Sequence, residues 1–137
     1  MRLLITGASG FLGRNFLLAS DPAWKVDAVY HGANDFPAFV AHAGLRHVKV
    51  HRCDLSVEAQ VRAMAAILPE RFDAILYLAS NSDPAAAAVD PLADMMSGSA
   101  GLVTLLSAVR SNRLVYLSSG AVYEGLGGEV GPHLPVA

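Results

Sequence analysis

Short, nearly continuous apolar runs recur along the chain, and longer stretches with apolar residues at helical spacing separate them. Most of the short runs lack the alternation of a strand that has one face in water, so both of their faces should be buried. Strands of this kind are typical of a parallel sheet. The predicted strands are Arg2 to Thr6, Lys25 to Tyr30, His47 to His51, Ala74 to Ala79 and Leu114 to Ser118.

Parallel strands need crossover connections, and the stretches between the predicted strands have the pattern of helices. Between Val57 and Leu68 the apolar residues fall on one stripe that should face the sheet, and Ser56 is the predicted N-cap. The predicted helices are Phe11 to Ala19, Pro37 to Ala43, Val57 to Leu68 and Leu92 to Ser111.

The order of the strands follows from the right-handedness of crossovers. Numbered along the chain, the strands should lie in the order 3-2-1-4-5, which is a Rossmann-like doubly wound α/β fold. Ligands of this fold bind where the order reverses, beyond the carboxyl ends of the strands. The strand ends at Gly7, Ala79 and Ser118-Ser119 should therefore meet in one crevice. With 137 residues and 53% apolar composition, a single domain spanning residues 1–137 is expected.

A glycine-rich turn, Thr6-Gly7-Ala8-Ser9-Gly10-Phe11-Leu12-Gly13, stands between the first predicted strand and the first predicted helix. In this position it would direct free backbone N–H groups and the positive end of the helix toward a diphosphate. Its spacing is G-x-x-G-x-x-G instead of the dehydrogenase G-x-G-x-x-G, and a plain glycine turn before an ordinary helix is the alternative. The context of strand and helix favours a dinucleotide.

Charge and composition narrow the class of protein. The net charge of −2 and the scattered lysines and arginines disfavour nucleic acid, and no apolar run approaches the ~18 residues that span a bilayer. Cys53 is the only cysteine, which excludes an internal disulfide, fits a cytoplasmic protein and is expected to be a small buried residue.

Four segments together resemble the extended short-chain dehydrogenase/reductases, the family of NAD(P)-dependent nucleotide-sugar epimerases and dehydratases. The resemblance spans nearly the whole chain. The segments are Thr6 to Gly13, Cys53-Asp54-Leu55, Leu76-Tyr77-Leu78-Ala79 and Leu117-Ser118-Ser119-Gly120-Ala121-Val122-Tyr123.

The resemblance implies that Asp54 accepts a hydrogen bond from the adenine amino group and that Leu55 walls the ring. A structural role for Asp54, as a turn former at the strand end, is the alternative. The cofactor-binding residues are expected to be Gly7, Ser9, Gly10, Phe11, Leu12, Gly13, His31, Asp54, Leu55, Leu78, Ala79 and Ser80.

The same resemblance makes Ser119 the catalytic serine, which hydrogen-bonds the reacting hydroxyl or carbonyl of the sugar. Paired serines that only satisfy backbone groups are the alternative. The family's tyrosine belongs to a Y-x-x-x-K pair, and residues 1–137 contain no such pair, so Tyr123 is not assigned its role. We expect the chain to be truncated before the last strands, this pair and the substrate domain, and to be inactive as it stands.

Two further positions bear on the cofactor and the active site. Gly98 stands where the family usually has an asparagine that supports the active site, and the residue just after the second predicted strand is His31 instead of an acidic residue. Without a carboxylate there, and with Arg14 after the glycine loop, both NAD and NADP remain open and the balance favours NADP slightly. Asp35 is a less well placed candidate for selecting NAD.

No metal site is predicted, because the spacing of His42, His47 and His51 matches no recognised ligand set. The expected partner is a nucleotide sugar or a related small molecule, with Asn81, Ser82 and Ser119 as its contacts and Asp83 beside them. An exposed apolar edge is expected at the last strand, which more chain or a partner should cover. Family members are often dimers, and the predicted helix from Leu92 is a candidate for that interface.

Two functions therefore stay open. In the first, the chain is the cofactor-binding part of a nucleotide-sugar epimerase, dehydratase or reductase that acts by hydride transfer. In the second, the same fold is a module that binds or senses NAD(P) without catalysis, for which the missing tyrosine and lysine argue.

Overall fold

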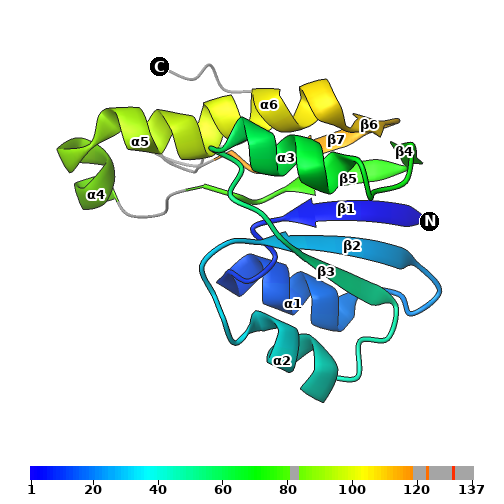
Figure 1. The fold of residues 1–137 in the computed structure, drawn as a ribbon. Coiled ribbons are helices and arrows are strands. Elements are labelled where there is room, and N and C mark those ends of the chain that lie inside the picture. Colours follow the sequence, from blue (N-terminus) through cyan, green and yellow to red (C-terminus); the bar gives the residue numbers. More distant parts are fainter. Residues whose placement is uncertain (81–83, 119–122, 124–130, 132–137) are drawn as a thin grey trace.

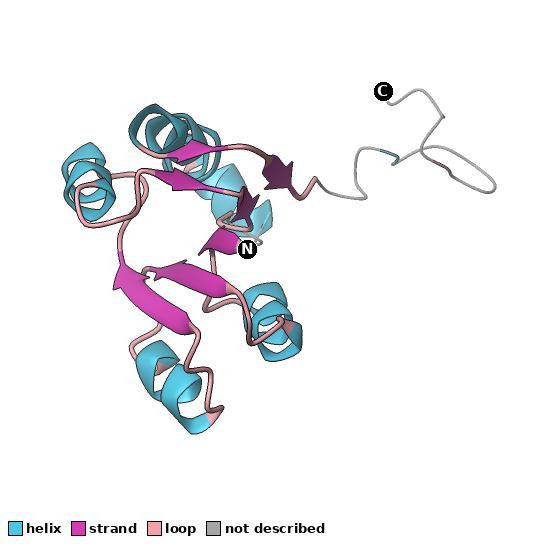
Figure 2. Ribbon diagram, turned by 90° about the vertical axis from the view of Figure 1, so that its right-hand side faces the viewer, coloured by secondary structure: helices cyan, strands magenta, loops and turns pink. Residues whose placement is uncertain are grey.

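The computed structural model describes residues 1–80, 84–118, 123 and 131, and its core is a parallel sheet with helices on both faces (Figures 1 and 2). The strands are β1 (Arg2–Thr6), β2 (Lys25–Tyr30), β3 (Val48–Arg52), β4 (Arg71–Phe72), β5 (Ala74–Tyr77), β6 (Arg110–Ser111) and β7 (Leu114–Tyr116). The helices are α1 (Phe11–Ala19), α2 (Phe36–His42), α3 (Glu58–Ala65), α4 (Pro84–Val89), α5 (Pro91–Met95), a π-helical turn η1 (Met96–Ala100) and α6 (Gly101–Ala108).

The five-stranded sheet has the order β3-β2-β1-β5-β7, and every pair in it is parallel. Since β5 and β7 are its fourth and fifth strands, the predicted order 3-2-1-4-5 is confirmed. A second, two-residue pair of β4 and β6 was not predicted, because strands this short carry no periodic signal. Phe72 of β4 is nonetheless fully buried.

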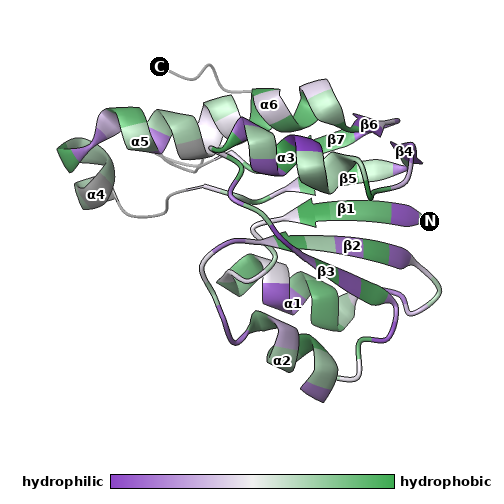
Figure 3. Cartoon of the chain, in the orientation of Figure 1, coloured by the Kyte–Doolittle hydropathy of each residue, from purple (hydrophilic) through white to green (hydrophobic). Residues whose placement is uncertain are grey.

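Both faces of the sheet are covered at β1, β2 and β5, which explains why these strands are mostly apolar without alternation. Leu3 and Ile5 of β1 pack in one cluster with Phe36 of α2, and Leu4 packs on the opposite face with Val61 of α3. Figure 3 shows apolar residues along the sheet and on the helix faces toward it. Among the described residues, no helix has the length and apolar character needed to cross a membrane.

The strands at the crevice end earlier than predicted. Beyond Tyr77 the backbone N–H groups of Leu78 and Ala79 donate to the Thr6 hydroxyl, at 3.2 and 3.3 Å, instead of continuing the ladder. β7 likewise ends at Tyr116, two residues before the prediction, and β3 is shifted by one residue to Val48–Arg52. The regular ladder between β1 and β5 therefore stops at Thr6 and Tyr77, and the segments beyond them stay in contact at the carboxyl edge of the sheet.

The predicted long helix differs from the structure at its end and in its interior. It ends at Ala108, because Val109 is extended (φ −124°, ψ 133°) and the next two residues form β6. Its interior contains the π-helical turn η1 around Gly98. The predicted N-cap of α3 is also wrong: Val57 is the N-cap residue, and the Ser56 hydroxyl donates to Asp54 instead.

The prediction of an exposed apolar edge is confirmed for β7. All of its residues are exposed, and Leu117 beyond it is also exposed. An unpaired apolar edge is a site where another strand can add, so β7 is the part of the described sheet that most needs a cover.

Candidate nucleotide-binding crevice

The glycine loop between β1 and α1 packs so closely on its neighbours that no side chain would fit at Gly7 or Gly13. Gly7 has a left-handed backbone (φ +63°), and a Cβ there would lie 2.7 Å from the carbonyl carbon and oxygen of Leu78. A Cβ at Gly13 would lie 2.5 Å from the carbonyl oxygen of Ala8. The first glycine therefore brings β1 against the end of β5, and the last brings α1 against the loop.

The amino terminus of α1 faces this edge without a side-chain cap. Gly10 is the N-cap residue, and no side chain accepts a hydrogen bond from the first turn. The first N–H groups of a helix have no partner within the helix, and its dipole adds partial positive charge there. This end of α1 is therefore suited to a phosphate group.

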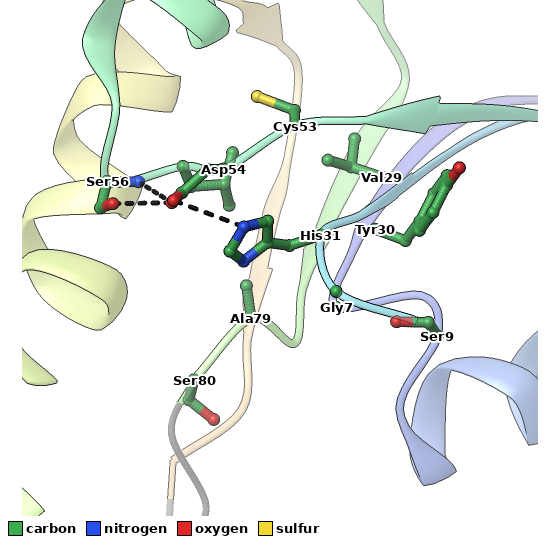
Figure 4. Close-up of a pocket in the computed structure, with 12 residues that line it drawn as sticks. Gly7, Ser9, Val29, Tyr30, His31, Cys53, Asp54, Ser56, Ala79 and Ser80 are labelled. Carbon is green, nitrogen blue, oxygen red and sulfur yellow. Dashed lines mark hydrogen bonds and ion pairs between the residues drawn. The ribbon is translucent and has the colours of Figure 1, made fainter. Parts of the chain in front are cut away.

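Two hollows meet at the carboxyl edge of the sheet and share Gly7, Ala79 and Ser80 (Figure 4 shows the first). The first hollow has a volume of about 270 Å³ and lies between the ends of β1, β2 and β3. The second has a volume of about 300 Å³ and lies between the glycine loop and the ends of β5 and β7. Together they form an elongated crevice with the glycine loop at its middle.

Every predicted cofactor-binding residue lines this crevice. The first hollow holds Gly7, Ser9, His31, Asp54, Leu55, Ala79 and Ser80. The second adds Gly10, Phe11, Leu12, Gly13 and Leu78, and Ser118 lies in it as well. The predicted catalytic Ser119 and the predicted substrate contacts Asn81, Ser82 and Asp83 lie outside the described residues. What the crevice binds is not tested by this geometry, so the roles remain predictions.

Asp54 is held in a turn at the end of β3. Its Oδ1 accepts hydrogen bonds from the backbone N–H and the hydroxyl of Ser56, at 2.9 and 2.6 Å. Its Oδ2 lies 3.5 Å from Nε2 of His31, whose side chain is mostly exposed at the opposite wall of the first hollow (Figure 4). The Ser56 hydrogen bond is the main cause that lowers the pKa of Asp54, so the group is a carboxylate at neutral pH.

Replacing Ser56 by alanine should raise the pKa of Asp54 toward its usual value. The Ser56 hydroxyl bonds to the carboxylate form of Asp54 and so favours that form. Its hydrogen bond therefore stabilises the fold fully above the unfolded-state pKa of about 3.9. This contribution to the free energy of unfolding is lost as the pH falls through the lower pKa of the folded state. An NMR titration of the Asp54 carboxyl carbon would measure the change, with S107A as a control in α6. An unchanged Asp54 pKa in S56A would contradict the assignment.

Two buried groups in the wall of the crevice have raised pKa values. Burial raises the pKa of Cys53 to about 11, so the thiol stays protonated at neutral pH, and its predicted burial is confirmed. Burial also raises the pKa of Tyr77 to about 12, and its hydroxyl donates to the Gly98 carbonyl oxygen at 2.9 Å. Tyr77 thus connects β5 to the π-helical turn.

Arg14 and Asp35 do not act as the separate charges that the sequence suggested. Arg14 Nη2 lies 2.8 Å from Asp35 Oδ2, its Nε donates to the Ser9 carbonyl oxygen, and its guanidinium packs 4.7 Å from the Phe39 ring centre. Neither residue is among those that line the two hollows. Their pairing leaves His31 as the predicted selector at the end of β2.

Three of the histidines have contacts of their own. His51 Nε2 lies 2.7 Å from Asp27 Oδ1, His47 Nε2 lies 2.8 Å from the Ser20 hydroxyl, and His42 is bonded to the Ala38 carbonyl oxygen. Within the described part of the chain, no three histidine, cysteine, aspartate or glutamate residues group as metal ligands.

Several residues of the crevice were not predicted. All of them stand at or just beyond strand ends, which is the signal that would have found them, and Ser56 also fits an Asp-x-Ser turn. They are Val29, Tyr30, Gly32, Cys53 and Ser56 in the first hollow and Tyr77, Tyr116 and Leu117 in the second.

Solved structures of similar fold include two sugar-nucleotide epimerases. The UDP-Glc/GlcNAc 4-epimerase of Campylobacter jejuni superposes with a TM-score of 0.77 at 24% identity, over 99% of this chain and 43% of that one. The UDP-glucose 4-epimerase of Bifidobacterium longum, solved with NAD+ and UDP, gives 0.81 at 17% identity, over 100% of this chain and 43% of that one. At these identities the likeness establishes the Rossmann-like fold.

Sequence comparison establishes the family. A dTDP-glucose 4,6-dehydratase of Mycolicibacterium smegmatis is 30% identical over 92% of this chain, and the chain covers 38% of that protein's length. The model of the NAD-dependent epimerase/dehydratase family matches residues 3–133, which include all the described segments of the crevice. The chain belongs to the NAD-dependent epimerase/dehydratase family.

Proposed function

We propose that residues 1–137 form the cofactor-binding domain of an enzyme that acts by hydride transfer at a sugar carbon of a nucleotide sugar. The observation that carries this proposal is the pair of hollows joined at Gly7 and Ala79, with an uncapped helix terminus between them. Membership of the family supports it, as does the sugar-nucleotide chemistry named for the Mycolicibacterium relative. Epimerase, dehydratase and reductase reactions all fit it.

In this proposal different residues of the crevice bind different parts of the cofactor. The adenosine half lies in the first hollow, where the Asp54 carboxylate accepts from the adenine amino group and His31 stands beside the ribose. The diphosphate lies on the N–H groups of the glycine loop and α1. The nicotinamide half lies in the second hollow near Tyr116 and Ser118. When bound, the nicotinamide supplies hydride exchange.

The chain's own contribution to catalysis would come from Ser119, whose hydroxyl would stabilise charge on the reacting oxygen. Proton transfer needs a tyrosine with a lowered pKa, and residues 1–137 contain no Y-x-x-x-K pair to provide it. We therefore expect residues 1–137 alone to bind cofactor weakly or not at all, and to show no turnover. A non-catalytic NAD(P)-binding or sensing module is the second candidate, because the crevice could hold a cofactor in a protein that catalyses no reaction.

Cofactor binding and catalysis can be tested separately. Titration of the full product of the encoding gene with NADH and NADPH, followed by nucleotide fluorescence, tests binding, and absence of binding to both would overturn both candidates. The full product of the encoding gene is then incubated with NAD(P) and UDP- and dTDP-hexoses. Turnover would support the enzyme, whereas binding without turnover would support the module.

Replacing His31 by aspartate should shift the preference from NADPH to NADH by about tenfold or more. A carboxylate at the end of β2 accepts a hydrogen bond from the ribose 2′-hydroxyl and repels a 2′-phosphate. The ratio of the two dissociation constants measures the shift. H31N is the matched control of the same shape without charge, and equal ratios in H31D and H31N would contradict the placement of the ribose beside residue 31.

A further inference from the structure

A basic groove opens at the amino-terminal ends of β1, β2 and β3, at the opposite end of these strands from the crevice. Figure 3 shows the hydrophilic ends of β1 and β2 that border it. The groove has a volume of about 810 Å³, and Trp24 with the apolar segment 67–69 after α3 forms part of its wall. Its cationic residues are Arg2, Lys25, Arg46 and Lys49.

Cationic side chains outnumber carboxylates among the residues that line the basic groove. It collects four of the ten lysine and arginine residues of a chain whose net charge is −2, including both lysines. Within the described part of the chain, none of these four side chains forms an ion pair. Asp27 is the one acidic residue among those that line the groove, and its Oδ1 already contacts His51 at 2.7 Å.

Strand register places two of these cations where they repel each other. Arg2 of β1 lies directly opposite Lys25 of β2, and Lys49 of β3 lies two rows further along, opposite Asp27. Because residues two apart share a face, Arg2, Lys25 and Lys49 all lie on one face of the sheet. Like charges directly opposite each other destabilise a sheet. Such a local loss of stability is expected at a site whose residues are kept for binding a ligand.

We propose that the basic groove binds a compact anion that carries two or more phosphate groups. Neighbouring strands are about 4.8 Å apart and each residue rises about 3.3 Å, so the backbone positions of Arg2 and Lys49 are separated by roughly 12 Å, a span that one phosphate does not bridge. Arginine and lysine are the usual partners of phosphate oxygens. The volume is in the range of small-molecule sites, roughly 300–1,000 Å³. The half-buried Trp24 gives the ligand an apolar wall.

Trp24 also reports on the groove, because it is the only tryptophan of the chain. Tripolyphosphate, ATP and orthophosphate are titrated at constant ionic strength while tryptophan fluorescence is recorded. We expect tripolyphosphate to bind at least about tenfold more tightly than orthophosphate, since it reaches cations on more than one strand. Equal affinity for ATP and tripolyphosphate assigns the site to the phosphate chain alone, and tighter ATP binding assigns it to a nucleotide.

The double variant K25A/K49A should weaken tripolyphosphate binding at least about tenfold. The matched control R110A/R113A removes the same charge from exposed positions outside the groove and should leave the affinity unchanged. The variants leave the glycine loop intact, so an anion bound in the crevice would be held equally by all three proteins. Unchanged affinity in K25A/K49A, or no preference over orthophosphate in the wild type, would overturn the proposal.

Discussion

Replacement of Gly7 by alanine is expected to abolish measurable cofactor binding and to lower the free energy of unfolding by roughly 2–5 kcal/mol. Two costs add at this position. The left-handed backbone (φ +63°) strains any residue with a Cβ, and that Cβ would lie 2.7 Å from the Leu78 carbonyl group. Relief of the contact would push the end of β5 away from β1 and so widen the crevice at its middle. Urea denaturation and NADH titration measure the two effects.

Gly44 provides a matched control for this change. Its backbone is also left-handed (φ +66°), but nothing lies within 4 Å of the position that a Cβ would occupy. G44A should therefore cost only the conformational strain, about 1–2 kcal/mol, and leave NADH binding unchanged. Equal losses of stability in G7A and G44A would mean that the close approach of Leu78 contributes nothing.

The main features of the fold were predictable because each has a strong local signal. β1 and β2 are apolar runs buried on both faces, and their predicted bounds match the structure residue for residue. Right-handed crossovers then leave one order for the strands. The glycine loop was predictable because the backbone at Gly7 and the packing at Gly13 exclude side chains. This constraint requires glycine at both positions, and the glycines are visible in the sequence.

Features that depend on tertiary contacts were missed. The π-helical turn at Gly98 accompanies a hydroxyl from β5, 21 residues earlier, which no helical periodicity encodes. Ser56 was expected to cap α3, but Asp54 competes for its hydroxyl at 2.6 Å. The pairing of Arg14 with Asp35 joins α1 to the residue before α2, so neither charge could be assigned from its own position.

The two ends of the parallel sheet serve different purposes in these proposals. At the carboxyl end, backbone N–H groups and one helix terminus form the anion-binding elements, and the nearby carboxylate of Asp54 provides an acceptor. At the amino-terminal end, the anion-binding elements are the cationic side chains of the basic groove. The affinity for a diphosphate at the carboxyl end should therefore depend only weakly on salt concentration. The affinity of the basic groove for its anion should depend on it strongly, because salt screens exposed charges.

Removal of the Tyr77 side chain is expected to cost about 3–5 kcal/mol, the range for a large aromatic residue deleted from a core. Tyr77 is 1% exposed, stacks on Tyr116 at 6.0 Å between ring centres, and donates to the Gly98 carbonyl oxygen. Its hydroxyl oxygen also lies 3.2 Å from the position that a Cβ at Gly101 would occupy. Y77A should therefore loosen β5, the π-helical turn and the second hollow together.

Two controls separate packing from hydrogen bonding at this position. Y77F keeps the ring and loses only the bond to Gly98, so it should cost about 1 kcal/mol and increase amide exchange within Met96–Ala100. Y116A deletes the same side chain at a position 54% exposed and should cost far less than Y77A. If Y77F proved as damaging as Y77A, the hydroxyl would determine stability here and the packing of the ring would not. If amide exchange in the turn were unchanged in Y77F, the bond to Gly98 would not hold the π-helical turn in place.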